Sequence, residues 1–93
     1  MLNSQHLKTF KILVEMQSFT QAAKKLGVTQ PAVTQHIQKL EQGLGRQLVI
    51  RYGRHLELTP AGVDLYQYVL EMLEHYRQFK RSWQDGLVDD SAA

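Results

Sequence analysis

The chain has 93 residues, 43% hydrophobic and 22% charged, which fits one small globular domain and excludes a disordered acidic tail, a collagen-like repeat and a membrane protein. It has no cysteine, which excludes a disulfide scaffold and a thiolate zinc site. The net charge of +2 combines two unlike parts. Residues 1–58 are basic, with eight Lys or Arg against three Asp or Glu, and residues 59–93 are acidic, with three Lys or Arg against six Asp or Glu. This division fits either two solvated faces or a polyanion-binding head on a non-binding stalk.

Two short helices are predicted at the N-terminal end. The first follows polar residues at positions 3 and 4 and lasts about three turns, with an apolar stripe of Leu7, Phe10, Leu13 and Val14. Ser18 begins the second helix, and Gln21 three residues later completes a capping box that satisfies free amides at the helix start. Its inner face contains Ala22, Ala23 and Leu26, and Gly27 ends it.

A third helix and a hairpin follow. Thr29 is the predicted N-cap, and Pro31 lies in the first turn, where its missing amide costs nothing. The helix covers about residues 30–42 and ends at the glycines 43 and 45, with a buried stripe of Val33, Ile37 and Leu40. Short strands at 47–50 and 56–58 flank a basic turn at 51–55, which predicts a two-stranded hairpin.

The longest predicted element is a helix over residues 59–84, which begins at Thr59 and Pro60. Its apolar residues are spaced 4, 3, 4, 3 and 4 apart, as in a dimer seam: Leu65, Val69, Met72, Tyr76, Phe79 and Trp83. A second stripe of Tyr66, Leu70 and Leu73 lies beside the seam, so one stripe can cover the small core while the rest needs another partner. Residues 85–93 are small, acidic and aperiodic, and are predicted to form a frayed tail.

The second and third helices have the spacing of a helix-turn-helix. Ala23 allows close approach of the helices, Gly27 makes the turn, and Val33 plugs the second helix into the core. Together with the caps and the basic hairpin, this spacing predicts a mainly α-helical fold: a winged helix-turn-helix of three helices and a two-stranded wing over residues 1–58, followed by a long linker helix that dimerises.

The outer face of the third helix is rich in amides and hydroxyls, and no acid occurs between residues 29 and 40. Because glutamine can bind adenine in the major groove and apolar groups can contact the thymine methyl, this face indicates base reading. The alternative is a solvated face with an accidental excess of glutamine. The candidate base-reading residues are Gln30, Pro31, Thr34, Gln35 and Gln38.

The basic turn is a candidate contact to DNA phosphates or to the minor groove, where narrow A/T tracts attract arginine. The alternative is a solvent-exposed turn that only needs polar residues. The candidates for wing and backbone contacts are Arg51, Arg54, His55, Ser18, Thr20, Thr29 and Lys39.

The run from Ser18 to Thr34, followed by Leu40-Glu41, Leu44-Gly45 and the segment 58–62, resembles the DNA-binding domain of LysR-type transcriptional regulators. The resemblance covers roughly residues 5–83. It implies a bacterial winged helix-turn-helix whose linker helix pairs antiparallel with that of a second copy, so that a homodimer binds an interrupted palindrome of double-stranded DNA. It also implies base reading by Gln30, Pro31, Thr34 and Gln35, with Arg54 as the wing arginine.

This sequence departs from the family pattern at several positions. The family commonly has Ser at Thr34, Arg at Gln35, Phe at Val49 and an acidic residue at Ile50. Loss of the arginine at Gln35 removes a charge that would contact guanine or phosphate, so we expect an altered half-site preference.

The resemblance also implies an effector-sensing domain of two α/β lobes after the linker helix, which this chain lacks. The chain is therefore interpreted as a truncated form of a longer regulator or as a naturally short one. A small-molecule effector is expected to act only through that further domain, and a full-length protein could form a tetramer. No cofactor is expected in this chain.

Two other function classes fit the sequence less well. An enzyme is not expected, because His6, His36, His55 and His75 include no i, i+4 pair, no cysteine completes a metal set, and no glycine-rich phosphate loop is present. A protein-interaction module would use Tyr76, Phe79 and Trp83 to bind a foreign helix instead of a second copy. Without a leader or membrane span, the sequence predicts a cytoplasmic protein with no membrane partner.

Overall fold

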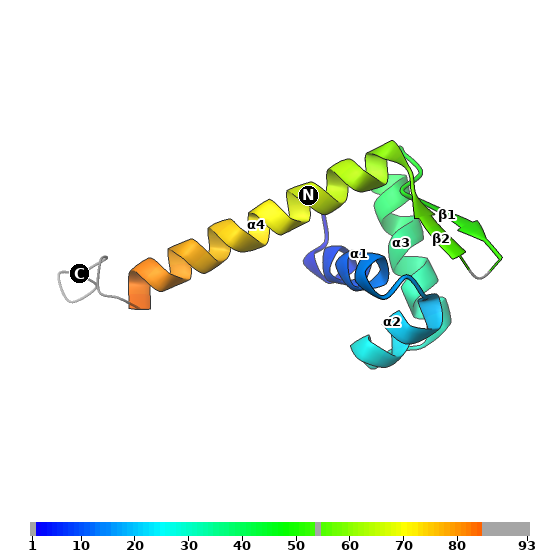
Figure 1. The fold of residues 1–93 in the computed structure, drawn as a ribbon, viewed down its shortest axis with the longest axis horizontal. Coiled ribbons are helices and arrows are strands. Elements are labelled where there is room, and N and C mark those ends of the chain that lie inside the picture. Colours follow the sequence, from blue (N-terminus) through cyan, green and yellow to red (C-terminus); the bar gives the residue numbers. More distant parts are fainter. Residues whose placement is uncertain (1, 54, 85–93) are drawn as a thin grey trace.

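The computed structural model describes residues 2–53 and 55–84, and its elements follow one another as helices, a hairpin and a long helix (Figure 1). They are α1 (Ser4–Met16), α2 (Phe19–Leu26), α3 (Gln30–Leu44), β1 (Val49–Tyr52), β2 (His55–Leu58) and α4 (Pro60–Gln84). The first three helices pack together, the two strands form a wing at one edge, and α4 runs past α1 and then projects away (Figure 1). The elements up to β2 are called the head below. The predicted winged helix-turn-helix with a long linker helix is confirmed.

Local capping explains where the first three helices begin. Asn3 Oδ1 accepts hydrogen bonds from the backbone amides of Gln5 and His6, at 2.8 and 3.1 Å. Ser18 Oγ accepts from an amide of the first turn of α2, and Thr29 Oγ1 does the same for α3, as the sequence predicts. Gly27 ends α2 with φ of +70°, a left-handed conformation that a side chain would disfavour. The third helix is longer than predicted, because it continues through position 43 and ends at Leu44.

The core of the head is formed by one apolar side of each helix together with the base of the wing. Its buried members are Leu7, Phe10, Leu13, Phe19, Ala22, Ala23, Val33, Ile37, Leu40, Leu48, Leu56, Leu65 and Val69. Leu65 and Val69 belong to α4, and they are only 7% and 2% exposed. Their assignment to a dimer seam was wrong, because the first half of α4 packs against α1 and β2 and uses these side chains to close the core of its own head.

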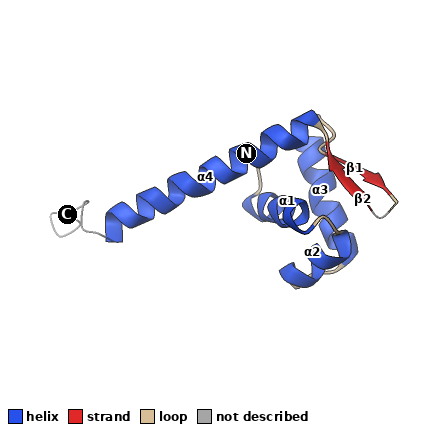
Figure 2. Ribbon diagram, viewed as in Figure 1, coloured by secondary structure: helices blue, strands red, loops and turns tan. Residues whose placement is uncertain are grey.

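The wing is a two-stranded antiparallel sheet of β1 and β2 (Figure 2). Val49 pairs with Leu58, and Tyr52 pairs with His55. The strands therefore extend into residues 51–55, and the turn is shorter than predicted. Glu41 of α3 fixes the wing to the third helix, because its Oε2 accepts hydrogen bonds from the backbone amides of Leu48 (2.8 Å) and Val49 (3.4 Å). The wing is thus tied directly to the helix that carries the candidate base-reading residues.

The start of α4 is fixed against the same segment. The Thr59 backbone amide donates to the Leu48 carbonyl oxygen at 3.0 Å, and Thr59 Oγ1 accepts from the amide of Gly62 at 3.0 Å. A Cβ atom at Gly62 would overlap the Leu48 carbonyl oxygen, so only glycine lets the helix approach so closely. The direction in which α4 leaves the head is set by these contacts.

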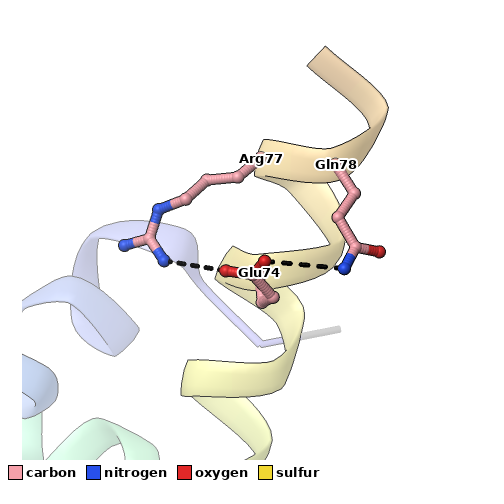
Figure 3. A network of polar contacts seen from close by, with 3 residues as sticks. All are labelled: Glu74, Arg77 and Gln78. Carbon is pink, nitrogen blue, oxygen red and sulfur yellow. Dashed lines mark hydrogen bonds and ion pairs between the residues drawn. The ribbon is translucent and has the colours of Figure 1, made fainter. Parts of the chain in front are cut away.

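The distal half of α4 lies beyond the head and carries a polar network on one side, in which Glu74 contacts Arg77 at 3.2 Å and Gln78 at 3.5 Å (Figure 3). Exposed pairs of this kind contribute little to stability. Within residues 2–53 and 55–84, none of the helices combines the length and the apolar character that a membrane crossing requires. The predicted tail at 85–93 lies outside the described residues.

Candidate nucleic-acid interface

The five candidate base-reading residues share one open hollow on the outer side of α3. The hollow is lined by Thr29, Gln30, Pro31, Ala32, Thr34, Gln35, Gln38 and Arg51. Thr34 is half-buried and the other four candidates are exposed, whereas Val33 and Ile37 on the opposite side of the helix are buried in the core. The helix therefore turns an uncharged polar face to solvent and adds one arginine from the wing.

A second hollow adjoins the first, between the wing and the beginnings of α2 and α3. It is lined by Gln17, Ser18, Phe19, Thr20, Gln30, Arg51, Gly53, His55 and Leu56. Gln30 and Arg51 line both hollows, so together the two hollows form a continuous surface. Because the first amides of a helix have no intrahelical acceptor, the start of α2 beside this surface suits an anion such as a phosphate.

Arg51 is positioned by an aromatic ring that the sequence analysis did not assign to the site. Its guanidinium carbon lies 3.9 Å from the ring centroid of Phe19, which is a cation–π geometry. Phe19 is itself buried, so it holds the arginine at the junction of the two hollows. Local sequence does not indicate this contact, because it joins the start of α2 to the first strand of the wing.

The other candidates for wing and backbone contacts fall into three groups by their position. Ser18, Thr20 and His55 line the second hollow and Thr29 lines the first, as a shared surface requires. Lys39 is exposed on α3 but lines neither hollow, and its positive charge contributes to the lowered pKa of His6 on α1. Arg54, the predicted wing arginine, lies outside the described residues.

Two polar groups behind the surface hold it in place. Glu41 ties the wing to α3, as described above. Thr9, which is fully buried on α1, contacts His36 of α3, with 2.8 Å between Thr9 Oγ1 and His36 Nδ1. Both act across elements that are distant in sequence, and for this reason spacing alone did not identify them. His36 therefore turns toward α1.

The distal part of α4 carries the other four residues of the predicted seam. Met72, Tyr76, Phe79 and Trp83 are all exposed, at 37%, 59%, 58% and 44%. The rings of Phe79 and Trp83 lie 5.5 Å apart between centroids. An apolar row of this size on a projecting helix is a surface that suits a protein partner. Across the described residues, no group of three or more His, Asp or Glu residues lies close enough to hold a metal ion.

Residues 4–63 match the model of the bacterial regulatory helix-turn-helix proteins of the LysR family. The chain belongs to the LysR family. Curated relatives of this LysR-family chain include the transcriptional regulator BenM of Acinetobacter baylyi, 45% identical over 78% of the chain and 24% of BenM. The regulator CysL of Bacillus subtilis is 43% identical over 80% of the chain and 25% of CysL. The chain thus spans about a quarter of the length of these relatives, which are named as regulators of transcription.

Solved structures of LysR-type proteins have the same fold. The DNA-binding domain of BenM in complex with catB site 1 DNA matches with a TM-score of 0.79 and 39% identity, over 90% of this chain and 94% of that one. Full-length LysG of Corynebacterium glutamicum matches with a TM-score of 0.85 and 28% identity, over 96% of this chain and 31% of that one. The LysR-type chain accordingly has the fold of the DNA-binding domain of BenM.

Proposed function

We propose that this LysR-type chain recognises a specific sequence of double-stranded DNA by placing α3 in the major groove. The observation that carries the proposal is the hollow on the outer side of α3, in which all five candidate base-reading residues meet with no carboxylate among the lining groups. A carboxylate there would repel phosphates. Each of the three glutamine amides carries a donor and an acceptor that complement the N7 acceptor and the N6 donor of adenine.

Each side chain has a role that follows from its chemistry. Gln30, Gln35 and Gln38 bind base edges through their amides. The methyl group of Thr34 and the ring of Pro31 contact thymine methyls. Because Gln30 lines both hollows, it lies where the base-reading part of the proposed surface meets the backbone-binding part.

Contacts to the DNA backbone come from the second hollow. Ser18 and Thr20 lie at the start of α2, where amides and hydroxyls can bind a phosphate, and Arg51 supplies a positive charge beside them. His55 lies on the wing beside the same hollow, and the wing reaches the minor groove or the phosphates. Arg54 is assigned to the wing tip from the sequence alone, and Lys39 to a phosphate at the flank of α3.

A homodimer is proposed through the distal half of α4. Met72, Tyr76, Phe79 and Trp83 are exposed there, and a second copy can cover them with the same four residues through a twofold axis. Two heads joined in this way bind an interrupted palindrome whose half-sites lie about one helical turn, or a multiple of it, apart. A second copy needs fewer assumptions than a foreign helix, because the two-headed arrangement also explains how one weakly basic head gains affinity.

The whole protein is proposed to respond to a small-molecule effector through residues beyond those of this chain. The proposal is supported by the quarter of BenM that the chain matches, and by the structure of full-length LysG with its bound effector, Arg. Assembly beyond a dimer, such as a tetramer, would depend on the same further residues. A regulator that binds the bacterial chromosome acts in the cytoplasm.

The test is selection of bound duplexes from a random DNA pool, with the chain as bait. The proposal predicts enrichment of one sequence that consists of two inverted half-sites with a fixed spacing. Enrichment of a single half-site would contradict the homodimer but leave base reading by α3 in place. Recovery of duplexes without any common sequence would contradict base reading itself.

A further inference from the structure

A polar cluster between α1 and α3 has no part in the proposed DNA contacts. Thr9 is fully buried, and its Oγ1 donates to the Gln5 carbonyl oxygen at 3.0 Å and lies 2.8 Å from His36 Nδ1. A hydroxyl can donate to one partner and accept from another, so Thr9 links the backbone of α1 to the imidazole of His36 on α3.

His6 of α1 stacks on His36. The ring centroids are 4.8 Å apart with 32° between the planes, and both side chains are half-buried. The pair forms a contact between α1 and the helix that carries the candidate base-reading residues. Thr9 and this pair therefore fix the position and orientation of α3 relative to α1.

The charges around the pair oppose protonation. Burial lowers the pKa of His6, and the charges of His36 and then of Lys39, both on α3, lower it further. The carboxylates of the two helices are engaged elsewhere. Glu15 contacts Lys11 at 2.7 Å, and Glu41 binds the backbone amides at the start of the wing. A proton added to His6 would therefore place a second cation beside Lys39, while Glu15 and Glu41 bind other groups.

We propose that Thr9, His6 and His36 are positioning residues that fix the DNA-reading helix against α1, and that protonation of His6 at mildly acidic pH weakens this contact. The head then loses stability, and α3 loses its fixed position. The effect on DNA selectivity rests on the proposed function of α3, whereas the effect on stability does not.

The direction of the pH effect follows from proton linkage. A histidine in the unfolded chain titrates near pH ~6.5, and the folded chain binds the proton less readily because the pKa of His6 is lowered. The stability from this contact is complete above that pH and is lost as the pH falls through the lowered folded pKa. Simple charge attraction predicts the opposite for DNA, because added protons make the head more cationic and strengthen binding to a polyanion.

The first test measures thermal unfolding of the 93-residue chain from about pH 7.5 to about pH 5.5, the range in which histidine titrates. The variant His6→Gln removes the titrating imidazole, and H36Q removes the ring on which it stacks while it keeps a hydrogen-bonding group beside Thr9. The matched controls are His55→Gln and His75→Gln, which replace exposed histidines. The midpoint of the unmodified chain should fall as the pH falls. Each variant of the pair should lose at least half of this dependence, and the controls should keep it. An unchanged dependence in His6→Gln, or its loss in a control, would overturn the proposal.

The second test measures the ratio of affinities for a selected duplex and for a random-sequence duplex over the same pH range. We expect the ratio to fall several-fold toward the acidic end in the unmodified chain and to stay nearly constant in His6→Gln. A ratio independent of pH in the unmodified chain would contradict the positioning role toward DNA. If no duplex can be selected, the proposed function fails, and the melting series still decides whether the histidine pair controls stability.

Discussion

The close contact at Gly62 determines whether a substitution there stabilises or destabilises the fold. The change is Gly62→Ala in the first turn of α4. The new Cβ would overlap the Leu48 carbonyl oxygen and lie 3.1 Å from a methyl carbon of Leu58. The Leu48 carbonyl cannot move away freely, because it accepts the Thr59 amide at 3.0 Å, and the Leu48 amide is held by the carboxylate of Glu41.

The magnitude follows from three contributions. Alanine in a helix favours folding by about 0.5–1 kcal/mol relative to glycine. Overpacking costs about 1–3 kcal/mol, and weakening the bond from Thr59 to Leu48 costs about 1 kcal/mol more. The net loss is about 2 kcal/mol, which lowers the melting midpoint of a domain of this size by about 8–16 °C.

The matched control is Gly43→Ala, since Gly43 also lies in a helix and a Cβ there meets no atom within 4 Å. This variant should gain about 0.5–1 kcal/mol and melt at a higher temperature. The assay is thermal unfolding followed by circular dichroism, with all variants at the same protein concentration because dimerisation shifts the midpoint. If Gly62→Ala melts at or above the midpoint of the unmodified chain, or if both variants lose equally, the reasoning about the contact with Leu48 is refuted.

Three further predictions address the wing, the linker helix and the contact between α3 and the wing. Arg51→Ala should reduce the slope of log affinity against log salt concentration by about 1, and an unchanged slope would mean that Arg51 meets no phosphate. Tyr76→Asp should give folded monomers in sedimentation, whereas Val69→Asp should unfold the head because Val69 is 2% exposed in its core; a folded Val69→Asp variant would contradict that placement. Glu41→Ala should lower the free energy of unfolding by about 1.5–3 kcal/mol in a denaturant titration, since it removes a charged acceptor from the first amides of the wing; an equal loss in Glu57→Ala, at an exposed wing position, would contradict this.

The parts of the fold that depend on neighbouring residues could be predicted from the sequence. Caps such as Ser18 and Thr29 act within one turn of their helix, and Gly27 ends α2 through its own backbone conformation. The hairpin was found, but its turn was predicted too long. Arg51 and His55 lie at exposed strand positions, where polar residues are common. Because a polar exposed strand has the composition of a turn, these two residues were included in the predicted turn.

The parts that depend on distant residues could not be predicted. Periodicity identifies the apolar side of α4 but not the surface that covers it, so Leu65 and Val69 were assigned to a dimer although the head covers them. The same limit applies behind the candidate site. The packing of Arg51 on Phe19 and the bond of Thr9 to His36 join residues that are brought together only by the packing of helices and wing.

The central claim is that the glutamine-rich side of α3 reads DNA bases. The most direct measurement compares Gln30→Ala with Gln42→Ala, which changes an exposed glutamine of the same helix that lines neither hollow. For each variant, the affinity for a selected duplex is divided by the affinity for a random-sequence duplex at one salt concentration. The account predicts that Gln30→Ala loses about 1–3 kcal/mol of this discrimination and that Gln42→Ala loses none. Equal weakening on both duplexes in Gln30→Ala, or equal losses of discrimination in the two variants, would contradict it.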